Sequence, residues 1–456
     1  MGSANKIKQL ILLAGDTVIF YLSLYLALWL RYLEKPAADR WANHFWPFTV
    51  IFIAWLTIFY IARLYNLHFA VNNFKFIQLT LNSLAAAAII SLGFFYLAPG
   101  IGIAPKTNLL IHVIIFALLF LAWRRIFNWL LKAYLPKNNI AFIGLNNEVR
   151  EIARELEQKP HLGYNIAFIV DDRGEAGKTT GNIPIISGVS ELAEKVSEKK
   201  VTALILSSDP HQSDELRNSL FACLPLKINF IGLPNFYETV TGRIPIEVIN
   251  QMWFLENLSE GSKVWFGRIK RVYDFVLATI ILIVTLPFWP FIALVIKFES
   301  RGPVFIKMER SGKNNVPFKM FKFRTMREEG NDRLPTAIND SRITNFGSFL
   351  RKTRLDELPQ TINILKGDMS FVGPRPERPK LIKDLERAIP FYKERMLVKP
   401  GTTGWDQISG EYHSPSFEDS LKKLQYDLFY IKNRSIYLDL SIILKTIATV
   451  LSRQGR

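Results

Sequence analysis

Two adjacent carboxylates, Asp356 and Glu357, stand between basic residues and a proline-bracketed arginine in LRKTRLDELPQTINILKGDMSFVGPRPERP, residues 350–379. Neighbouring side chains on a helix diverge by about 100°, so the two carboxylates are not a matched acid and base acting on one substrate atom. Separate tasks are the better interpretation: one carboxylate attacks or accepts a proton, and the other holds a cation such as Mg²⁺. A surface helix with ion pairs would use the same residue types, but the dense Gly and Pro of KGDMSFVGPRPERP favour a positioned site.

The cations near this dyad suit a substrate that carries phosphate. Arg351 lies five residues before Asp356, and Arg375 lies on the Pro-Arg-Pro turn. Guanidinium groups can bind diphosphate oxygens in bidentate fashion. The segment PFKMFKFRTM is expected to be a strand that carries Lys322 and Arg324 among aromatic residues, although an edge strand with solvated cations has the same composition. These four cations are the candidate substrate phosphate-binding residues.

Four more residues are candidate ligands. Asp368 in KGDMS is either a second metal ligand beside Glu357 or a turn-forming aspartate, and the spacing leaves both open. The loop VKPGTTGWDQ offers Lys399 to a phosphate, Trp405 to a nucleotide base, and Gln407 as a further nucleotide contact. Trp405 is equally suited to a membrane interface.

The composition places part of the chain in a lipid bilayer. Its 49% hydrophobic residues and positive mean hydropathy exceed what an ordinary soluble enzyme shows. Residues 260–456 hold 34 Lys and Arg against 21 Asp and Glu, which is most of the net charge of +17. Beside membrane segments, such a basic block favours anionic lipid and phosphorylated small substrates over nucleic acid. The single cysteine, Cys223, excludes an internal disulfide and a metal–thiolate cluster.

Four apolar runs, near 9–30, 45–62, 76–98 and 107–131, predict a four-helix transmembrane bundle over residues 1–136. An even number of spans puts the N-terminus and the region after the bundle on one side of the membrane. Eight Lys and Arg flank the spans on that side against four on the other, which favours a cytoplasmic location for both. Arg124 and Arg125 are expected at the cytoplasmic end of the fourth span.

Residues 137–255 predict a Rossmann-like α/β domain. The apolar segments NNIAFIGL, YNIAFIVDD and VTALILSS alternate with polar helical stretches, as in a mostly parallel sheet. Asp171 and Asp172 end the second strand, where a ribose-binding acid would stand. The first turn, GLNNEV, has one glycine where a pyrophosphate loop needs two or three, so we expect a degenerate, regulatory or structural domain. A nucleotide-sugar epimerase or dehydrogenase would also need a Tyr-x-x-x-Lys pair, which residues 138–250 lack.

A fifth apolar run, residues 272–296, opens the predicted catalytic domain, residues 256–456. Pro287 and Pro290 near its middle cannot donate to a helix ladder, so a break there can turn the chain back to the face it entered. We therefore expect a re-entrant membrane helix over 268–297. The alternative is a kinked fifth span, which would place the rest of the chain outside the cell, where a synthetic enzyme has no nucleotides.

From about residue 266 to the C-terminus the chain closely resembles the bacterial sugar transferase family, the polyprenyl-phosphate hexose-1-phosphate transferases, also called monotopic phosphoglycosyl transferases. The matching segments are KRVYDFVLA, the proline-broken hairpin, FKMFKFRTM, RKTRLDELPQTINILKGDMSFVGPRP, KPGTTGW and YDLFYIKNRSIYLDL. Many relatives carry Ser-Pro at the hairpin break, whereas this chain has Leu286-Pro287 and so lacks that hydroxyl. The four spans and the degenerate Rossmann domain resemble the large form of the family, such as undecaprenyl-phosphate galactose or glucose phosphotransferases.

The resemblance implies transfer of hexose 1-phosphate from a UDP-hexose to polyprenyl (undecaprenyl) phosphate, as the first membrane step of exopolysaccharide, O-antigen or capsule biosynthesis. Asp356 would be the nucleophile that expels UMP and forms a phosphosugar intermediate, and Glu357 would hold Mg²⁺ against the diphosphate, with Asp368 as its candidate partner. The expected location is the bacterial inner membrane, with a mainly α, monotopic catalytic domain on the cytoplasmic face. A homodimer contact through the N-terminal helices and the α/β domain is a further expectation. The alternative function is a membrane-anchored nucleotide-sensing or scaffold protein.

Overall fold

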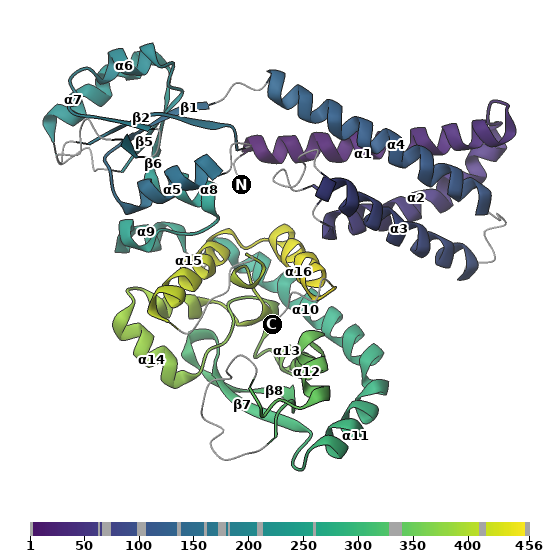
Figure 1. The fold of residues 1–456 in the computed structure, drawn as a ribbon. Coiled ribbons are helices and arrows are strands. Elements are labelled where there is room, and N and C mark those ends of the chain that lie inside the picture. The colour runs from purple at the N-terminus through teal and green to yellow at the C-terminus, as the bar shows by residue number, and fades with distance from the viewer. Residues whose placement is uncertain are drawn as a thin grey trace. The chain divides into compact units, whose positions relative to one another are not determined.

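The chain divides into two compact units, residues 1–241 and 242–456 (Figure 1). The predicted domain boundaries, 1–136, 137–255 and 256–456, stay predictions. The computed structural model describes residues 3–62, 64–65, 74–97, 106–134, 138–158, 162–171, 179–180, 183–207, 213–258, 261–327, 340–409 and 416–451.

Four apolar helices begin the first unit and confirm the prediction of four. They are α1 (Ser3–Tyr32), α2 (Ala38–Ile61), α3 (Phe74–Leu97) and α4 (Lys106–Tyr134). Each is long and apolar enough to cross a bilayer. Aromatic rings fill the space between them: Phe20 stacks on Phe52 and on Phe116, both at 4.7 Å between ring centroids. Such close packing supplies the helix association that hydrophobicity cannot supply inside lipid.

An ion pair lies in the core of these helices. Arg124 Nη2 on α4 donates to Asp16 Oδ2 on α1 at 2.7 Å, and both side chains are at most 1% exposed. The guanidinium of Arg124 thus points inward to a carboxylate, and its expected place at the cytoplasmic end of the fourth span stays a prediction. Arg125, the next residue, is exposed. Charged groups at such depth normally pair with one another, since an unpaired charge in lipid is costly.

A mostly parallel sheet confirms the predicted α/β pattern. Its strand order is β3-β4-β2-β1-β5-β6, and only β3 runs antiparallel to its neighbour. Asn146 caps α5 by accepting from the Val149 N–H at 2.9 Å, and Gly144 in the same turn has φ +95°. Asp171 is buried at the end of β2, and Asp172 lies outside the described residues. The strands and helices are β1 (Asn138–Ile143), α5 (Asn147–Gln158), β2 (Tyr164–Val170), β3 (Thr179–Thr180), β4 (Ile183–Ile186), α6 (Leu192–Glu198), β5 (Ala203–Leu206), α7 (Asp214–Ala222), β6 (Asn229–Gly232) and α8 (Leu233–Thr241).

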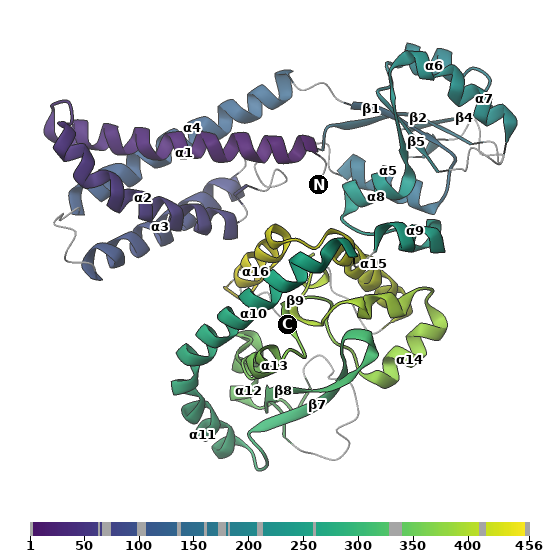
Figure 2. The ribbon, with the colours of Figure 1, turned by 180° about the vertical axis from the view of Figure 1, so that it is seen from behind.

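The second unit is rich in helices, as predicted, and holds two small two-stranded sheets (Figure 2). The strands β7 and β8 form an antiparallel hairpin, and β9 pairs with β10 in parallel. The elements are α9 (Gln251–Asn257), α10 (Val264–Thr285), α11 (Trp289–Glu299), β7 (Phe305–Ser311), β8 (Pro317–Phe323), α12 (Asn345–Lys352), α13 (Gln360–Lys366), β9 (Ser370–Val372), α14 (Pro379–Ala388), β10 (Gly401–Thr403), α15 (Phe417–Asn433) and α16 (Ile436–Leu451).

The long apolar helix of this unit breaks where the prolines predicted. A 3₁₀ turn, η7 (Leu286–Phe288), separates α10 from α11, and the chain bends there (Figures 1 and 2). Pro287 lies in this turn, and Pro290 lies in the first turn of α11, where a missing N–H costs nothing. A hydroxyl is present after all, one residue earlier than in Ser-Pro relatives: Thr285 Oγ1 accepts from Trp289 Nε1 at 3.3 Å.

Both halves of the broken helix pack against the same globular body. Ala278 of α10 lies in a buried cluster with Ile364 of α13. Trp289 of α11 lies in another with Phe323 of β8 and Leu350 of α12. The outward faces of the two halves carry a row of exposed apolar side chains, among them Val272, Ile280, Ile283, Phe288, Phe291 and Leu294. Both halves thus pack on one body, and the choice between a re-entrant helix and a kinked fifth span stays a prediction.

Candidate active site

The two carboxylates lie on a tight turn that a strained residue sets up. Helix α12 ends at Lys352, and Arg354 then adopts φ +58°, a left-handed conformation that few non-glycine residues take. A 3₁₀ turn, η9 (Leu355–Glu357), follows and leads through Pro359 into α13. Asp356 is 7% exposed. The two carboxylates therefore leave the chain in different directions from a fixed piece of backbone.

Three cations surround Glu357. Its Oε1 lies 2.7 Å from Lys322 Nζ and 3.1 Å from Arg375 Nη2, while its Oε2 lies 3.7 Å from Arg354 Nη1. Burial alone would raise the pKa of Glu357, but Lys322, Arg375 and Arg354 together lower it well below its ordinary value. Glu357 is therefore an anion at every physiological pH, and it holds three cations at one point.

Asp356 has a different environment. Its one ion pair among the described residues is Oδ2 to Lys322 Nζ, at 3.5 Å, and no hydrogen bond reaches its carboxylate there. Burial raises the pKa of Asp356, and Lys322 opposes that rise. When two neighbouring carboxylates have environments that shift their pKa values in opposite directions, they are suited to different chemical roles. Among the described residues the Asp356 carboxylate accepts no hydrogen bond, so its oxygens are available to attack when it is ionised, whereas Glu357 is engaged by three cations.

Lys322 lies on strand β8 and contacts both carboxylates, and Asn363 of α13 holds this strand in place. The buried Asn363 side chain accepts from the Phe321 N–H at 3.0 Å and donates to the Lys319 carbonyl at 2.8 Å. The sequence reading missed Asn363. A polar residue on the buried face of TINILKGD was the available signal.

The predicted phosphate-binding arginines occupy two different places. Arg351 Nε donates to Thr325 Oγ1 at 2.9 Å, and its charge lowers the pKa of Asp356, so it borders the dyad. Arg324 is 2% exposed and its Nη2 donates to the Ser300 carbonyl at 2.7 Å, just past the end of α11. The structure thus brings Lys322, Arg351 and Arg375 to the dyad, while Arg324 bonds to the residue that follows α11, and phosphate binding by these four cations stays a prediction.

Asp368 is not joined to the dyad by any hydrogen bond or ion pair between described residues. It follows Gly367, which caps α13 with φ +92°, and its Oδ2 accepts from Asn363 Nδ2 at 3.2 Å. Asp368 interacts with Lys399: burial, together with Arg271, lowers the pKa of Lys399, and the negative charges of Asp274 and Asp368 oppose that shift. The residues around Asp368 and Lys399 form a separate polar cluster under α10.

Trp405 is used within the second unit. Its indole N–H donates to the Gly242 carbonyl at 2.9 Å, and its ring stacks on Phe429 at 5.2 Å. Lys445 Nζ lies 5.1 Å from the ring centroid. Gln407 is half-buried, one turn away on η11 (Asp406–Ile408). A nucleotide contact by Lys399, Trp405 or Gln407 stays a prediction.

Two glycines bring the Pro-Arg-Pro turn against β10. A Cβ at Gly373 would lie 2.4 Å from the Lys399 carbonyl oxygen and 2.9 Å from the Gly401 nitrogen, both backbone atoms that cannot rotate away. We predict that Gly373→Ala displaces Arg375 and lowers the melting temperature of the protein by several degrees. Gly267→Ala is the matched control, because nothing lies within 4 Å of a Cβ there and alanine favours a helix by about 1 kcal/mol. Differential scanning fluorimetry of both variants checks this, and an unchanged Gly373→Ala melting temperature would contradict it.

The segment that contains this site matches a known protein family. A family profile described as "Bacterial sugar transferase" matches residues 265–453. This segment contains the broken helix, the two carboxylates and the cations that surround them. A second profile, described as "CoA-binding domain", matches residues 60–232. The chain is 34% identical over 325 residues to a "UDP-glucose:undecaprenyl-phosphate glucose-1-phosphate transferase" of Xanthomonas campestris pv. campestris, covering 69% of this chain and 67% of that one. The chain belongs to the bacterial sugar transferase family.

Two further members of the family match over shorter lengths. A "UDP-N-acetylgalactosamine-undecaprenyl-phosphate N-acetylgalactosaminephosphotransferase" of Aeromonas hydrophila is 36% identical over 249 residues, 54% of this chain and 58% of that one. A "UDP-glucose:undecaprenyl-phosphate glucose-1-phosphate transferase" of Escherichia coli (strain K12) is 43% identical over 182 residues, 39% of each chain. The names of these relatives include different sugars, so similarity alone does not select one.

Proposed function

We propose that this protein transfers a sugar 1-phosphate from a UDP-sugar to undecaprenyl phosphate and releases UMP. The observation that carries the proposal is the difference between the two carboxylates. Glu357 pairs with three cations, whereas Asp356 has one ion pair among the described residues, with Lys322 at 3.5 Å. The relatives' printed names supply the substrate classes. A scaffold protein would have no need of a buried carboxylate that accepts no hydrogen bond from the described residues.

The residues support a covalent route in two steps. A carboxylate oxygen of Asp356 attacks the sugar-bearing phosphorus of the UDP-sugar, a bond from aspartate to phosphorus forms, and the bond to the UMP oxygen breaks. An oxygen of undecaprenyl phosphate then attacks the same phosphorus and frees Asp356. Each displacement replaces one phosphorus–oxygen bond by another, and the aspartate is regenerated.

The cations of the site have distinct tasks in this route. Lys322 lies within 3.5 Å of both carboxylates and balances the negative charge that the diphosphate would bring close to them. Arg375 has a side chain that is 42% exposed, so its fork can turn from Glu357 to a phosphate. Arg351 lies on the flank of Asp356 and adds a third positive charge.

These carboxylates suit a magnesium ion that the protein would share with a bound substrate. No group of three or more metal-binding side chains occurs among the residues that the structure describes. Mg²⁺ usually binds proteins through one or two carboxylates and completes its shell with substrate phosphates and water. Glu357, with Asp356 adjacent, would supply such carboxylates once Arg375 turns from it to a substrate phosphate, and metal binding by Glu357 or Asp368 stays a prediction. When bound, the ion would neutralise diphosphate charge, while Glu357 fixes its place.

We also propose that the catalytic body lies on the cytoplasmic face of the inner membrane. The packing of α10 and α11 on one body and the exposed apolar row along them support a re-entrant helix. A cysteine placed at residue 456 should then react with a membrane-impermeant maleimide only after the inner membrane is opened. Labelling in intact spheroplasts would contradict this orientation. A homodimer also stays a proposal, which the mass of the detergent-solubilised protein would test.

Membranes that contain the protein test the function directly. They are incubated with undecaprenyl phosphate and, in turn, UDP-glucose, UDP-galactose and their N-acetylated forms, and UMP is measured. We expect lipid-dependent UMP release with at least one of these donors. Release with none of them, at protein levels confirmed by immunoblot, would refute the proposal. The preferred donor identifies the sugar, which rests on a few hydrogen bonds within the site.

A further inference from the structure

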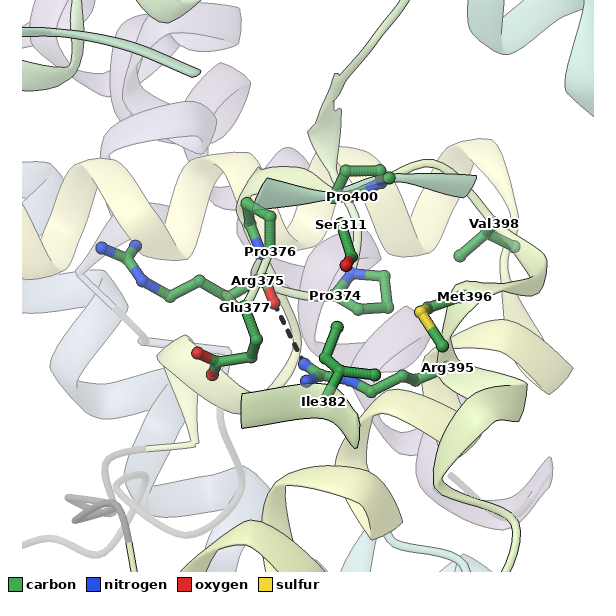
Figure 3. Close-up of a pocket in the computed structure, with 11 residues that line it drawn as sticks. Ser311, Pro374, Arg375, Pro376, Glu377, Ile382, Arg395, Met396, Val398 and Pro400 are labelled. Atoms are coloured by element: carbon green, nitrogen blue, oxygen red, sulfur yellow. Dashed lines mark hydrogen bonds between the residues drawn. The ribbon is translucent and has the colours of Figure 1, made fainter. Parts of the chain in front are cut away.

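The Pro-Arg-Pro turn needs hydrogen-bond donors from elsewhere, because two of its three residues have no N–H. The structure provides them on both sides. The Gly401 N–H donates to the Pro374 carbonyl at 3.0 Å, and Arg395 Nη2 donates to the Arg375 carbonyl at 3.1 Å. Figure 3 shows this second bond, with the Arg375 side chain running away from Arg395. The two arginines therefore meet through a backbone oxygen and not through their like charges.

The Arg395 guanidinium is itself fully held. It lies on a 3₁₀ segment, η10 (Tyr392–Leu397), and is 4% exposed. Its Nε donates to Asp427 Oδ2 at 3.0 Å, its Nη2 lies 2.8 Å from the same oxygen, and its Nη1 donates to the Tyr392 hydroxyl at 2.7 Å. Asp427 on α15 is 2% exposed. All three nitrogens are bonded, so this side chain has one orientation.

A buried ion pair is a costly way to gain stability, because well-packed apolar residues often serve as well. Burial raises the pKa of Asp427 to about 7 even though Arg395 opposes the rise. This pair differs from a plain structural pair because Arg395 also bonds to the carbonyl of Arg375, the residue whose side chain reaches Glu357. Planar forks such as guanidinium fix geometry in a way that an ammonium cannot.

We infer that Arg395, oriented by Asp427 and Tyr392, is a positioning residue that fixes the Arg375 backbone so that the Arg375 side chain meets the donor diphosphate. This inference rests on the proposed function. Arg395 does not touch substrate in this scheme. It acts only through Arg375. Its loss should therefore affect the step that uses Arg375, whereas a loss of folded protein would affect both half-reactions equally.

The test uses the two half-reactions of the full-length enzyme in detergent. In a two-step covalent mechanism, kcat/KM for the UDP-sugar reports the first half-reaction and kcat/KM for undecaprenyl phosphate reports the second. Arg395→Lys keeps the charge and loses the fork, and we expect it to lower kcat/KM for the UDP-sugar by about 10- to 100-fold. We expect kcat/KM for the lipid to change by less than about twofold, and Arg387→Lys, an exposed arginine of α14, to change neither.

Two further variants separate positioning from folding. Tyr392→Phe removes one hydroxyl from a buried ring, leaves the shape of the core, and should lower kcat/KM for the UDP-sugar by a few-fold. In an Arg375→Ala background, the additional effect of Arg395→Lys should nearly vanish, because the two residues act as one unit. Where the double variant is too slow to assay, the affinities of the four proteins for UDP are measured instead and give the same double-mutant cycle.

The outcomes distinguish the inference from the function beneath it. Wild-type protein that releases no UMP with any donor would refute the proposed function. Active wild-type protein with an unchanged Arg395→Lys variant would overturn the inference alone. Equal losses in both half-reactions, or an Arg395→Lys effect that persists undiminished beside Arg375→Ala, would also overturn it, since both describe a purely structural role.

Discussion

Replacing Asp356 by asparagine should abolish UMP release, with a loss of at least about 10³-fold, the scale on which removal of a covalent nucleophile acts. The asparagine amide has the same shape but cannot form the bond to phosphorus. Burial raises the pKa of Asp356, so the fold disfavours its charged form, and the neutral amide should leave the protein as stable as before or slightly more stable. A melting curve and a UMP assay on one preparation measure both effects.

Asp384→Asn is the matched control for this experiment. Asp384 is an exposed aspartate on α14, so the same chemical change should alter neither activity nor stability. Activity of Asp356→Asn near the wild-type level would exclude Asp356 as the nucleophile. A large drop in melting temperature would instead show that the Asp356 carboxylate is a structural group.

Breaking the ion pair between Asp16 and Arg124 should be the most destabilising change in the first unit. Removing one partner leaves a buried charge without its counter-ion, and such a loss costs about 3–5 kcal/mol. Arg124→Met and Asp16→Leu should each lower the melting temperature strongly. The double variant, Asp16→Leu with Arg124→Met, should recover most of the loss, because it removes both charges together.

Thermal unfolding of the detergent-solubilised protein measures this cycle, and Arg125→Met is its control. Arg125 is exposed beside Arg124, so its replacement by methionine should have little effect. Additive losses in the double variant would contradict the pairing. Small effects in both single variants would place the two charges in contact with water.

The sequence predicted the large features of the fold because hydropathy and element order determine them. Four apolar runs gave four helices, and alternating short strands and polar helices gave the mostly parallel sheet. Pro287 and Pro290 predicted the helix break, since neither can donate to the ladder. In each case the signal lies within one segment of sequence.

Features that depend on how segments meet could not be predicted. Asp16 and Arg124 are 108 positions apart, and each alone looked like an isolated charge in an apolar run. Arg324 was grouped with Lys322 because both lie on one short segment, yet one side chain reaches the end of α11 and the other reaches the dyad. Which partner such a residue finds depends on the rotation and register of elements distant in the chain.

The two carboxylates, Asp356 and Glu357, combine a feature that the sequence predicted with one that it did not. Its residue types and its neighbours predicted separate roles for the two carboxylates, and the structure gives them separate environments. The prediction placed them on a regular helix, whereas they lie on a 3₁₀ turn set by the left-handed Arg354. Arg395 and Asp427 were not singled out, because a positioning pair has no motif of its own and appears only when the turn it holds is seen.

The most direct test of the covalent route is a single-turnover experiment without the acceptor lipid. Purified, lipid-depleted protein is mixed with the UDP-sugar that it prefers, and UMP is measured beside the intact mass of the protein. We predict a burst of at most one equivalent of UMP and an added mass of one sugar phosphate, both absent in Asp356→Asn. UMP that appears only after undecaprenyl phosphate is added, with no change in protein mass, would contradict the account.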